Sequence, residues 1–419
     1  MEPTGRWFRG GFFLGGGGPP SCIEMGQKAR GLMDRSLRIL MVCPQFRPIV
    51  GGYERAAERL AQELARQGHS VDVVTERRDL SWPRLEQQSG VTIHRLWCRP
   101  VPRWHTLTSA LSLFRFMVRR SRSYDIIHIH QYGSMAALAI GLGQRMGVKV
   151  VLKLTNTGYQ GLDAALPNTL LGRRIRSLHR RVDACVATSQ RAADEAEAFG
   201  IAQRQIHRIP NALDVEHFRP PTEGERRQAR SSLGLGSGFL ALNVCRLTAQ
   251  KNHALLIDAW ADGLASQENA LLSILGDGPL KERLRDQIGQ RGVDQSVRLL
   301  GQVSDPLSWY WAADLFVLSS DVEGLSNSLM EALCCGLPVV STRVSGSEDV
   351  FEASAVGRLV EPGDQPALRA ALEEMSLDPA GRARCGEVAR RYAEARYALP
   401  VVVAQTVKLY SDLLGERRL

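Results

Sequence analysis

The sequence has no apolar run long enough to cross a membrane. Spanning a bilayer takes roughly 18–20 apolar residues, and the longest candidates, such as AALAIGLGQRMG and DLFVLSS, are typical of a core helix or a buried strand. The first 32 residues also lack the continuous apolar stretch of a secretory signal, because glycines interrupt it in GGFFLGGGGPP. We therefore expect a soluble globular protein that folds from about Arg35, after an extension at 1–34 that is disordered or precedes the true start.

Cysteine patterns of metal sites and disulfide frameworks are also missing. The eight cysteines are spread through segments that look like strands and helices, with no C-x-x-C pair and no nearby histidine pair. Such a distribution is typical of reduced, mostly buried thiols in a cytosolic protein.

Two classes of ligand-binding motif are absent. There is no G-x-G-x-x-G dinucleotide-binding loop and no recognised nucleic-acid-binding motif. Residues 1–220 nevertheless carry 32 basic and 18 acidic residues, a net charge of +14, whereas residues 221–419 carry 21 and 26, a net charge of −5. The asymmetry indicates that the first half faces something anionic, either nucleic acid or a membrane surface.

The sequence does have a regular alternation of short apolar segments and amphipathic ones. RILMVC and SVDVVT flank YERAAERLAQELARQG, and the same alternation restarts at FLALNVC after a polar, proline-bearing stretch. This predicts two parallel sheets, each covered by helices on both faces, with a cleft between them that suits an enzyme joining two substrates. The predicted organisation is an N-terminal domain, a linker, a C-terminal domain and a final helix able to pack back on the N-terminal domain, at 35–211, 212–236, 237–396 and 397–419 respectively.

The stretch SSDVEGLSNSLMEALCCGLPVVST combines two acids with a helix start. Glu323 stands on a glycine-containing turn, Ser326 can cap the helix that follows, and Glu331 lies one turn into it. A helix N-terminus presents unpaired N–H groups and a partial positive charge, so it can hold a phosphate. An ordinary capped helix with solvated acids is the alternative interpretation.

Other predicted strand ends carry glycines and cations. Gly51 and Gly52 stand where the first strand gives way to helix, which allows close approach of a ligand or simply a tight turn. Arg246 and Lys251 follow the first strand of the second domain, where they can clamp a diphosphate or remain solvated. Another turn against which a ligand could lie contains Gly276 and Gly278.

Taken in order, these pieces resemble a known family. The motifs P-x-x-x-x-x-x-G-G-x-E, H-x-H, P-N-x-x-D-x-x-x-F-x-P, R-L-x-x-x-K-N, G-x-G-P, E-G-x-S-N-x-x-x-E-A-x-x-x-G-x-P-V-V and G-x-L-V-x-P-G-D run from about Arg38 to about Ala395. Their order and spacing are similar to those of the large retaining glycosyltransferase family numbered four. The resemblance implies the GT-B fold, with two Rossmann-like domains, the first on the acceptor side and the second binding a nucleotide-sugar.

The resemblance also implies roles for individual residues. Arg246 and Lys251 would neutralise the donor diphosphate, aided by the helix start at Ser326, Asn327, Ser328 and Leu329. Glu331 would accept hydrogen bonds from the ribose, and Glu323 would face the donor sugar. Gly51 and Gly52 would close over the phosphates, and the turn with Gly276 and Gly278 would line the donor site. His130 would lie beside the reacting sugar, although a histidine at the end of a buried strand is more often structural.

The sequence departs from the family pattern at two places. Asn211-Ala212 replaces Asn-Gly at the hinge, and alanine there would be strained if the position needs a positive φ. Ser345-Gly346 replaces a double glycine, and the acid that follows is displaced or replaced by Asp349. These departures bear on the contacts to the donor sugar and leave the predicted fold unchanged.

The function that follows is retaining transfer of a sugar from a nucleotide-diphosphate-sugar to a saccharide or lipid-linked acceptor, in cell-envelope polysaccharide or lipopolysaccharide synthesis. No metal and no cofactor beyond the donor is implied, because the sequence has no D-x-D. The alternatives are a nucleotide-sugar epimerase of similar architecture, which would not need the basic first domain, and a non-catalytic nucleotide-sugar-binding relative, which would be expected to lose Glu323, Arg246 or Lys251.

A segment of the first half is strongly basic and bears on the acceptor. From Arg103 to Arg181 the chain has thirteen basic residues and two acids. The segment HTLTSALSLFRFMVRRSRS places apolar residues beside arginines, as a helix lying in a lipid interface would. The residues concerned are Leu111, Leu113, Phe114, Phe116 and Met117, with Arg115, Arg119, Arg120 and Arg122. We therefore expect peripheral attachment to the cytoplasmic face of the membrane and no nucleic-acid partner; a solvated arginine face over core residues is the alternative.

Overall fold

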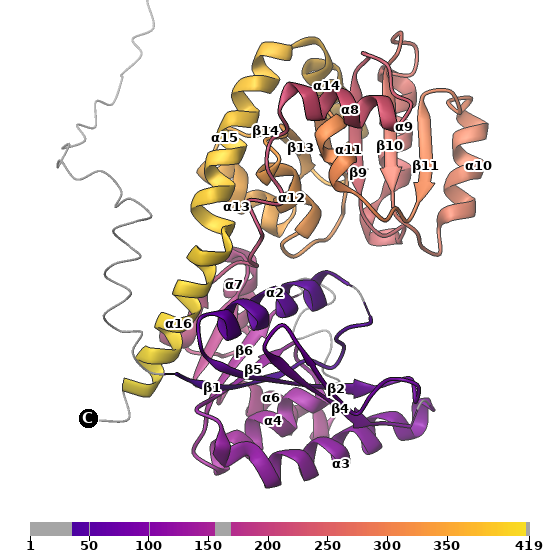
Figure 1. The fold of residues 1–419 in the computed structure, drawn as a ribbon. Helices are drawn as coiled ribbons and strands as arrows, with labels where there is room; N and C mark the ends of the chain where they lie inside the picture. Colours follow the sequence, from indigo (N-terminus) through magenta and orange to yellow (C-terminus); the bar gives the residue numbers. More distant parts are fainter. Residues whose placement is uncertain (1–35, 50, 100, 156–168, 416–419) are drawn as a thin grey trace, which may run out of the picture. The chain divides into compact units, whose positions relative to one another are not determined.

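The computed structural model describes residues 36–49, 51–99, 101–155 and 169–415. The predicted extension at 1–34 lies outside the described residues. The described chain alternates strands and helices almost throughout (Figure 1) and builds two parallel sheets, as the apolar periodicity predicts.

The first sheet has the first strand of the chain, β1, near its centre and a polar strand, β3, at its edge. Seven of its described strands run parallel, whereas β3 pairs antiparallel with β4. The sequence of β3, LEQQ, has no apolar alternation, which is why the pattern did not predict it. The strand order is β3 (Leu85–Gln88), β4 (Val91–Trp97), β2 (Ser70–Arg77), β1 (Arg38–Val42), β5 (Ile126–His130), β6 (Lys149–Leu154), β7 (Ala184–Ala187) and β8 (Ile206–Arg208).

Helices cover both faces of this sheet. On one face, α2 (Gly52–Arg66) packs with α16 (Leu399–Gly415); on the other lie α3 (Pro102–Arg120), α4 (Ser134–Arg145) and α6 (Leu170–His179) (Figure 1). Each face buries its own apolar cluster, so the central strands are apolar on both sides. The helix α7 (Gln190–Ala198) follows β7, and the hydroxyl of Ser189 caps it.

The second sheet is parallel throughout its described strands. Its order is β11 (Val297–Gly301), β10 (Leu271–Leu275), β9 (Leu240–Val244), β12 (Leu315–Leu318), β13 (Val339–Thr342) and β14 (Gly357–Val360). One apolar cluster includes α9 (His253–Gly263), α10 (Lys281–Arg291) and α14 (Gln365–Leu377). The other includes α11 (Leu307–Ala312), α12 (Asn327–Cys334), α13 (Ser345–Ala353) and α15 (Pro379–Tyr397).

The segment predicted as a linker contains a helix, α8 (Glu223–Ser232). The Thr222 hydroxyl accepts a hydrogen bond from the Glu225 N–H at 3.2 Å, and the Glu225 carboxylate accepts one from the Thr222 N–H at 2.8 Å. This capping box satisfies two N–H groups at the helix start. The T-x-x-E spacing of Thr222 and Glu225 is the sequence signal for this helix start.

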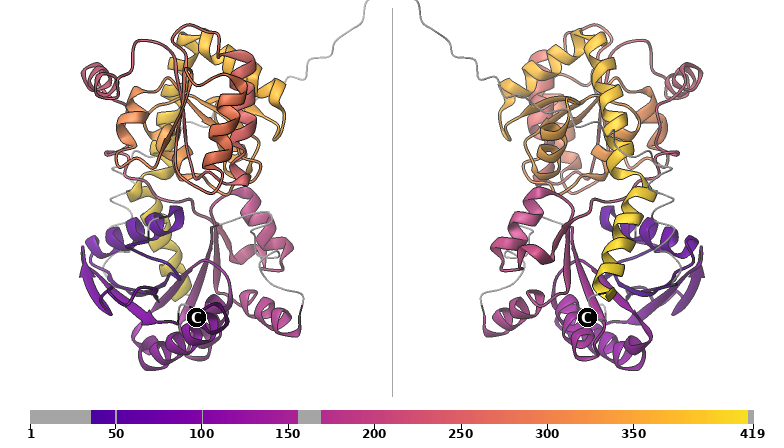
Figure 2. Two further views of the ribbon diagram at one scale, coloured as in Figure 1. Left: turned by 90° about the vertical axis from the view of Figure 1, so that its right-hand side faces the viewer. Right: turned by 90° about the vertical axis from the view of Figure 1, so that its left-hand side faces the viewer.

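The C-terminal helices contribute to both cores. Tyr397 of α15 is buried in the cluster around α12, whereas Val403 and Tyr410 of α16 are buried against the first sheet. The Tyr410 hydroxyl lies 2.6 Å from Nδ1 of His128 in β5. Both views in Figure 2 show α16 running beside the first sheet. Among the described helices, none is long and apolar enough to span a bilayer.

Candidate functional site

The start of α12 is held by short-range hydrogen bonds. The Ser326 hydroxyl accepts a hydrogen bond from the Leu329 N–H at 3.4 Å and lies 3.0 Å from the Ser328 hydroxyl. The Gly346 N–H donates to the Gly324 carbonyl at 2.9 Å, and a Cβ at Gly346 would lie 2.6 Å from that same oxygen. The loop before α12 therefore rests directly on the start of α13, and only glycine fits beneath it.

Lys251 and Glu323 form an ion pair at the carboxyl ends of two neighbouring strands. The Lys251 ammonium donates to Oε2 of Glu323, and the two side chains are 10% and 15% exposed. Because β9 and β12 are adjacent, the segments that follow them meet; the Ser319 hydroxyl donates to the Lys251 carbonyl at 3.0 Å. Burial lowers the pKa of Lys251. The structure thus brings together two of the predicted catalytic residues.

Arg246 follows the same strand, β9, and is exposed, with no ion-pair partner among the described residues. The turn after β10 packs tightly against this strand end. A Cβ at Gly276 would lie 1.9 Å from the Cys245 carbonyl oxygen, and one at Gly278 would lie 2.4 Å from that of Leu247. Glycine is needed at both positions for this close approach. The two predicted glycines therefore shape the backbone on either side of Arg246.

Glu331, in α12, is buried, with 5% of its surface exposed. The Tyr310 hydroxyl donates to its Oε2 at 3.0 Å, and a guanidinium nitrogen of Arg59, from α2, lies 3.9 Å from Oε1. Burial raises the pKa of Glu331. Its role toward a ribose stays a prediction. Arg59 and Tyr310 were not predicted, because neither stands in a strand-end motif.

The predicted glycine pair meets the predicted phosphate seat. The Asn327 side-chain amide donates to the Gly52 carbonyl at 2.7 Å, and its Oδ1 accepts from the Asn211 amide at 3.3 Å. Gly51 precedes α2 without a side-chain cap, and a Cβ there would lie 2.3 Å from a carboxylate oxygen of Glu54. The helix starts of α2 and α12 are therefore neighbours, and the acid of the G-G-x-E motif folds back beside Gly51.

The two departures from the family pattern have structural explanations. Ala212 is not among the described residues with positive φ, so alanine is not strained at the hinge. Asp349 accepts hydrogen bonds from the Gln190 N–H at 2.9 Å and from the Arg208 guanidinium at 3.1 Å. The displaced acid thus links α13 to the region of α7 and β8.

His130 lies at the end of β5, away from solvent at 1% exposure. Its ring lies 4.3 Å from that of His128, and its Nε2 has no hydrogen-bond partner within the described part of the chain. Burial keeps the pKa of His130 well below its usual range, so the ring is neutral. Lys153 pairs with it in register on β6, and burial lowers the Lys153 pKa to about 8. The sequence signal for this buried ammonium is a lysine within the apolar strand VKVVLKL.

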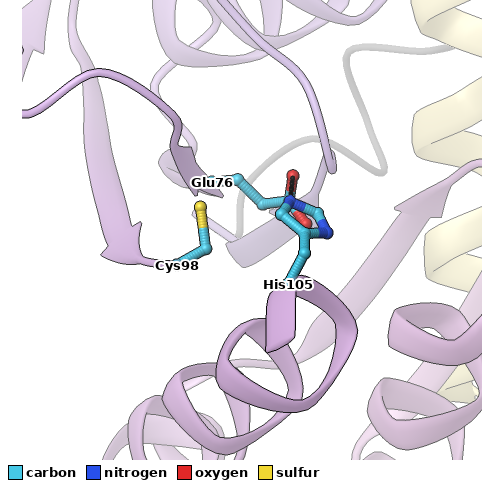
Figure 3. Close-up of side chains that lie close together, drawn as sticks. All are labelled: Glu76, Cys98 and His105. Atoms are coloured by element: carbon cyan, nitrogen blue, oxygen red, sulfur yellow. Dashed lines mark ion pairs between the residues drawn. The ribbon is translucent and has the colours of Figure 1, made fainter. Parts of the chain in front are cut away.

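The described residues include one cluster of side chains with metal-ligating atoms, Glu76, Cys98 and His105 (Figure 3). These atoms already have protein partners. The His105 Nε2 lies 3.2 Å from Oε2 of Glu76, to which Arg78 also donates at 2.9 Å, and the Cys98 thiol donates to the Arg77 carbonyl at 3.5 Å. The cluster is accounted for by these contacts, and we assign no metal to it.

Comparison with known proteins places the chain in a family. A model described as Glycosyl transferase 4-like domain matches residues 51–212, and a model described as Glycosyl transferases group 1 matches residues 225–392. The two matches together cover most of the chain. The protein is a glycosyltransferase of the family 4 type.

Relatives of known activity support this assignment. The glycosyltransferase is 27% identical over 389 residues to a GDP-mannose-dependent alpha-mannosyltransferase of Mycobacterium tuberculosis, covering 91% of this chain and 98% of the relative. It is 26% identical over 397 residues to a GDP-mannose-dependent monoacylated alpha-(1-6)-phosphatidylinositol monomannoside mannosyltransferase of Corynebacterium glutamicum, covering 88% and 97%. Both relatives are glycosyltransferases, which speaks against the epimerase alternative.

The fold of this glycosyltransferase is GT-B. The structure of HepE from Anabaena in complex with UDP-glucose matches it with a TM-score of 0.75 at 20% identity, over 90% of this chain and all of the other. The predicted fold class is confirmed.

Proposed function

We propose that this glycosyltransferase moves a sugar from a nucleotide-diphosphate-sugar to a saccharide or lipid-linked acceptor with retention of anomeric configuration. The observation that carries the proposal is the contact of Lys251 with Glu323 beside the start of α12. There, an ammonium and free helix N–H groups can receive a diphosphate, while a carboxylate faces the adjoining sugar.

The charges suit a reaction in which negative charge grows on the diphosphate. As the bond between the anomeric carbon and the phosphate oxygen breaks, Lys251 and the exposed Arg246 stabilise the leaving group. Glu323 stabilises the positive charge on the sugar ring. The acceptor oxygen bonds to the anomeric carbon on the same face, and its proton passes to the departing phosphate oxygen, so no separate protein base is required.

With Arg246 and Lys251 beside the diphosphate, transfer should not require a divalent ion. In other enzymes a metal neutralises the transferring phosphate; here Arg246 and Lys251 take that role. We expect turnover in excess EDTA to equal turnover with added Mg²⁺ or Mn²⁺. Loss of activity in EDTA, with recovery on adding either ion, would contradict metal-free transfer.

Donor and product are open to direct measurement. The relatives are named for GDP-mannose, and the structural neighbour was solved with UDP-glucose, so a panel of GDP- and UDP-sugars is the first choice, with membrane lipid extracts as acceptors. Mass spectrometry identifies the product, and proton NMR of the new linkage gives its anomeric configuration. An inverted linkage would overturn the retaining mechanism.

The acceptor side carries an unusual apolar surface. Among the described residues, eleven large apolar side chains are exposed, and nine of them lie between Leu80 and Val118. Five follow one face of α3 at helical spacing, each at least 44% exposed; this α3 apolar stripe consists of Trp104, Leu107, Leu111, Phe114 and Val118. A contiguous stripe of this kind on a soluble protein indicates an interaction surface.

The composition of the stripe corrects the prediction from sequence. Leu113 and Met117 are fully buried in the core, and Phe116 is partly buried against it, whereas Leu111 and Phe114 are exposed as expected. Arg115, Arg119 and Arg120 follow on the same helix. We propose that α3 lies on the cytoplasmic face of the membrane, with the apolar stripe in the interface and the arginines near anionic lipid. There the enzyme would contribute to the synthesis of cell-envelope saccharides.

A further inference from the structure

Two cavities that differ in charge, one balanced and one positive, lie at the edge of the first sheet and share one residue, Arg95 of β4. The balanced cavity, of about 520 Å³, has three arginines and three glutamates in its wall: Arg47, Arg55, Arg95, Glu54, Glu58 and Glu86. The arginine cavity, of about 410 Å³, has six arginines and no carboxylate: Arg77, Arg84, Arg95, Arg115, Arg119 and Arg120. Both volumes fall in the range of small-molecule sites.

Four of the six charged side chains in the balanced cavity form two ion pairs. A guanidinium nitrogen of Arg47 lies 2.5 Å from a Glu58 oxygen, and Arg95 lies 2.6 Å from Glu86. Trp82 adds an aromatic surface to the wall. A cavity with no net charge, many fixed donors and acceptors and one aromatic face suits a neutral polyhydroxylated ring better than an ion.

The balanced cavity also adjoins the predicted donor seat. Glu54 and Arg55 belong to the first turn of α2, whose first residue, Gly52, accepts the hydrogen bond from Asn327. The charge of Arg55 acts on Glu331, where it opposes the rise in the pKa of that carboxyl. A sugar ring in this cavity would therefore lie beside the first turn of α2, next to the donor seat.

Several arginines of the arginine cavity have no ion-pair partner among the described residues, although Arg95 pairs with Glu86. Within the described chain, Arg84, Arg115 and Arg119 have no ion-pair partner, and no acid lines the cavity. A cavity lined by guanidinium groups and no carboxylate favours a phosphate or diphosphate ligand. Trp97 and Phe116 line the same cavity, and it opens beside α3, which carries the apolar stripe.

We propose that the two cavities together bind one acceptor, a saccharide whose lipid end carries a phosphate or diphosphate. The sugar occupies the balanced cavity next to the donor seat, the phosphate occupies the arginine cavity, and the lipid chain leaves toward the α3 apolar stripe. This inference rests on the proposed function, since it names the acceptor class for the same transfer.

The chain contains a reporter in each cavity. Trp82 lines the balanced cavity and Trp97 lines the arginine cavity, among seven tryptophans in total. The full-length protein labelled with 5-fluorotryptophan gives ¹⁹F signals that Trp82→Phe and Trp97→Phe assign. Binding to the wild-type protein is then followed without any need for transfer, so failure of the proposed reaction would not be confused with failure of this inference.

Three probes separate the possibilities. Inorganic pyrophosphate should shift the Trp97 signal and leave that of Trp82 in place, whereas neutral methyl glycosides should shift Trp82 only. Geranyl diphosphate, which adds a short lipid chain, should bind at the Trp97 site about tenfold more tightly than pyrophosphate, because a few buried methylene groups supply that much. Equal affinities of pyrophosphate and geranyl diphosphate would refute the proposed lipid chain. A Trp97 signal that does not shift with pyrophosphate would refute the phosphate site, and a Trp82 signal that does not shift with glycosides would refute the sugar site.

Paired variants test the arginines themselves. Arg115→Gln with Arg119→Gln should weaken pyrophosphate binding by roughly tenfold or more, because hydrogen bonds to a charged ligand are lost, and should leave glycoside binding unchanged. Arg145→Gln with Arg204→Gln removes the same charge from exposed positions that do not line the cavity and should change neither affinity. An equal loss in both pairs would show a general charge effect and refute the cavity as the phosphate site.

Discussion

The side-chain amide of Asn327 donates a 2.7 Å hydrogen bond to the carbonyl of Gly52, joining residues 275 positions apart in the chain. Asn327 begins α12 and Gly52 begins α2, so one amide connects the start of a second-sheet helix to the start of a first-sheet helix. Its Oδ1 meanwhile accepts from Asn211. Asn327 thus fixes the separation of two helix starts that are both predicted to face the donor phosphates.

Replacing Asn327 should therefore damage transfer more than folding. Asn327→Ala removes both hydrogen bonds, and Asn327→Asp keeps the size but cannot donate to the Gly52 carbonyl. We expect kcat/KM for the donor to fall about tenfold in each, because one to two hydrogen bonds in a positioned site are lost, with a melting temperature close to that of the wild type. Full activity in the aspartate variant would show that the link to Gly52 is not used.

Lys251 and Glu323 offer a sharper test of the chemistry. Lys251→Ala should lower kcat on the order of 10²–10³, as the loss of a charge contact to the transition state does elsewhere. Lys408→Ala removes another lysine from a surface ion pair, with Asp412, and should leave kcat unchanged. Steady-state kinetics on folded protein decide the matter, and wild-type kcat in Lys251→Ala would overturn the assignment.

Because the two side chains touch, their effects should not add. Once Lys251 is absent, removing Glu323 as well should cost less than it does in the wild type. Strictly additive effects in the double variant would mean that the two residues act independently in the reaction.

The sequence predicted most of the fold because its apolar segments carry the period of their structure. RILMV and LALNV became central strands, and Gly51 to Gln67 bound a helix close to the expected one. The strand β3 was missed because LEQQ lies at a sheet edge, where no burial imposes apolar residues. The helix α8 was missed although its capping box was present.

The site was predictable where a residue follows a strand, and less so elsewhere. Lys251 and Glu323 come after neighbouring strands, so topology alone brings them together. Arg59 reaches Glu331 from the middle of α2, with nothing in the local sequence to mark it. The burial of Leu113 and Met117 depends on which face of α3 meets the sheet, and a segment with large apolar residues on more than one face does not reveal this.

Lys153 gives a pH dependence with a defined sign. Burial lowers its pKa from 10.5 to about 8 in the folded protein, so between pH 8 and 10.5 the unfolded chain binds the additional proton. The free energy of unfolding should then rise with pH across that window, by up to about 3 kcal/mol. Lys153→Met removes the titrating group, so the variant should be more stable than the wild type at pH 7 and lose that advantage toward pH 10.

Chemical denaturation between pH 7 and 10 measures this difference. Lys149→Met is the matched control, since Lys149 stands on the same strand and is paired with Asp183 at 2.9 Å. Its unfolding curve should remain parallel to that of the wild type over the window. If the free energy of unfolding of Lys153→Met also varies with pH as that of the wild type does, then the Lys153 ammonium does not have the lowered pKa on which this prediction rests.

The α3 apolar stripe predicts attachment to anionic membranes by two separable forces. Leu107 and Leu111 are 60% and 55% exposed, and burying such side chains in the interface contributes about 1.5–3 kcal/mol each, while each cation near an anionic leaflet adds about 1 kcal/mol. Leu107→Ser with Leu111→Ser should therefore weaken binding at every salt concentration. Replacing four arginines by Glu should abolish the salt-dependent part of vesicle binding; these are Arg119, Arg120, Arg173 and Arg174.

Co-sedimentation with vesicles of anionic and neutral lipid, at low and high salt, tells these forces apart. Leu377→Ser changes an equally exposed leucine, at 77%, far along the sequence on α14, and should bind as the wild type does. Salt screens the arginine contribution, because the Debye length falls from about 10 Å at 0.1 M to 3 Å at 1 M, but leaves apolar burial in place. Residual binding at high salt that the leucine variant lacks would identify the stripe as the inserted surface. No binding of the wild type to anionic vesicles at low salt would refute peripheral attachment.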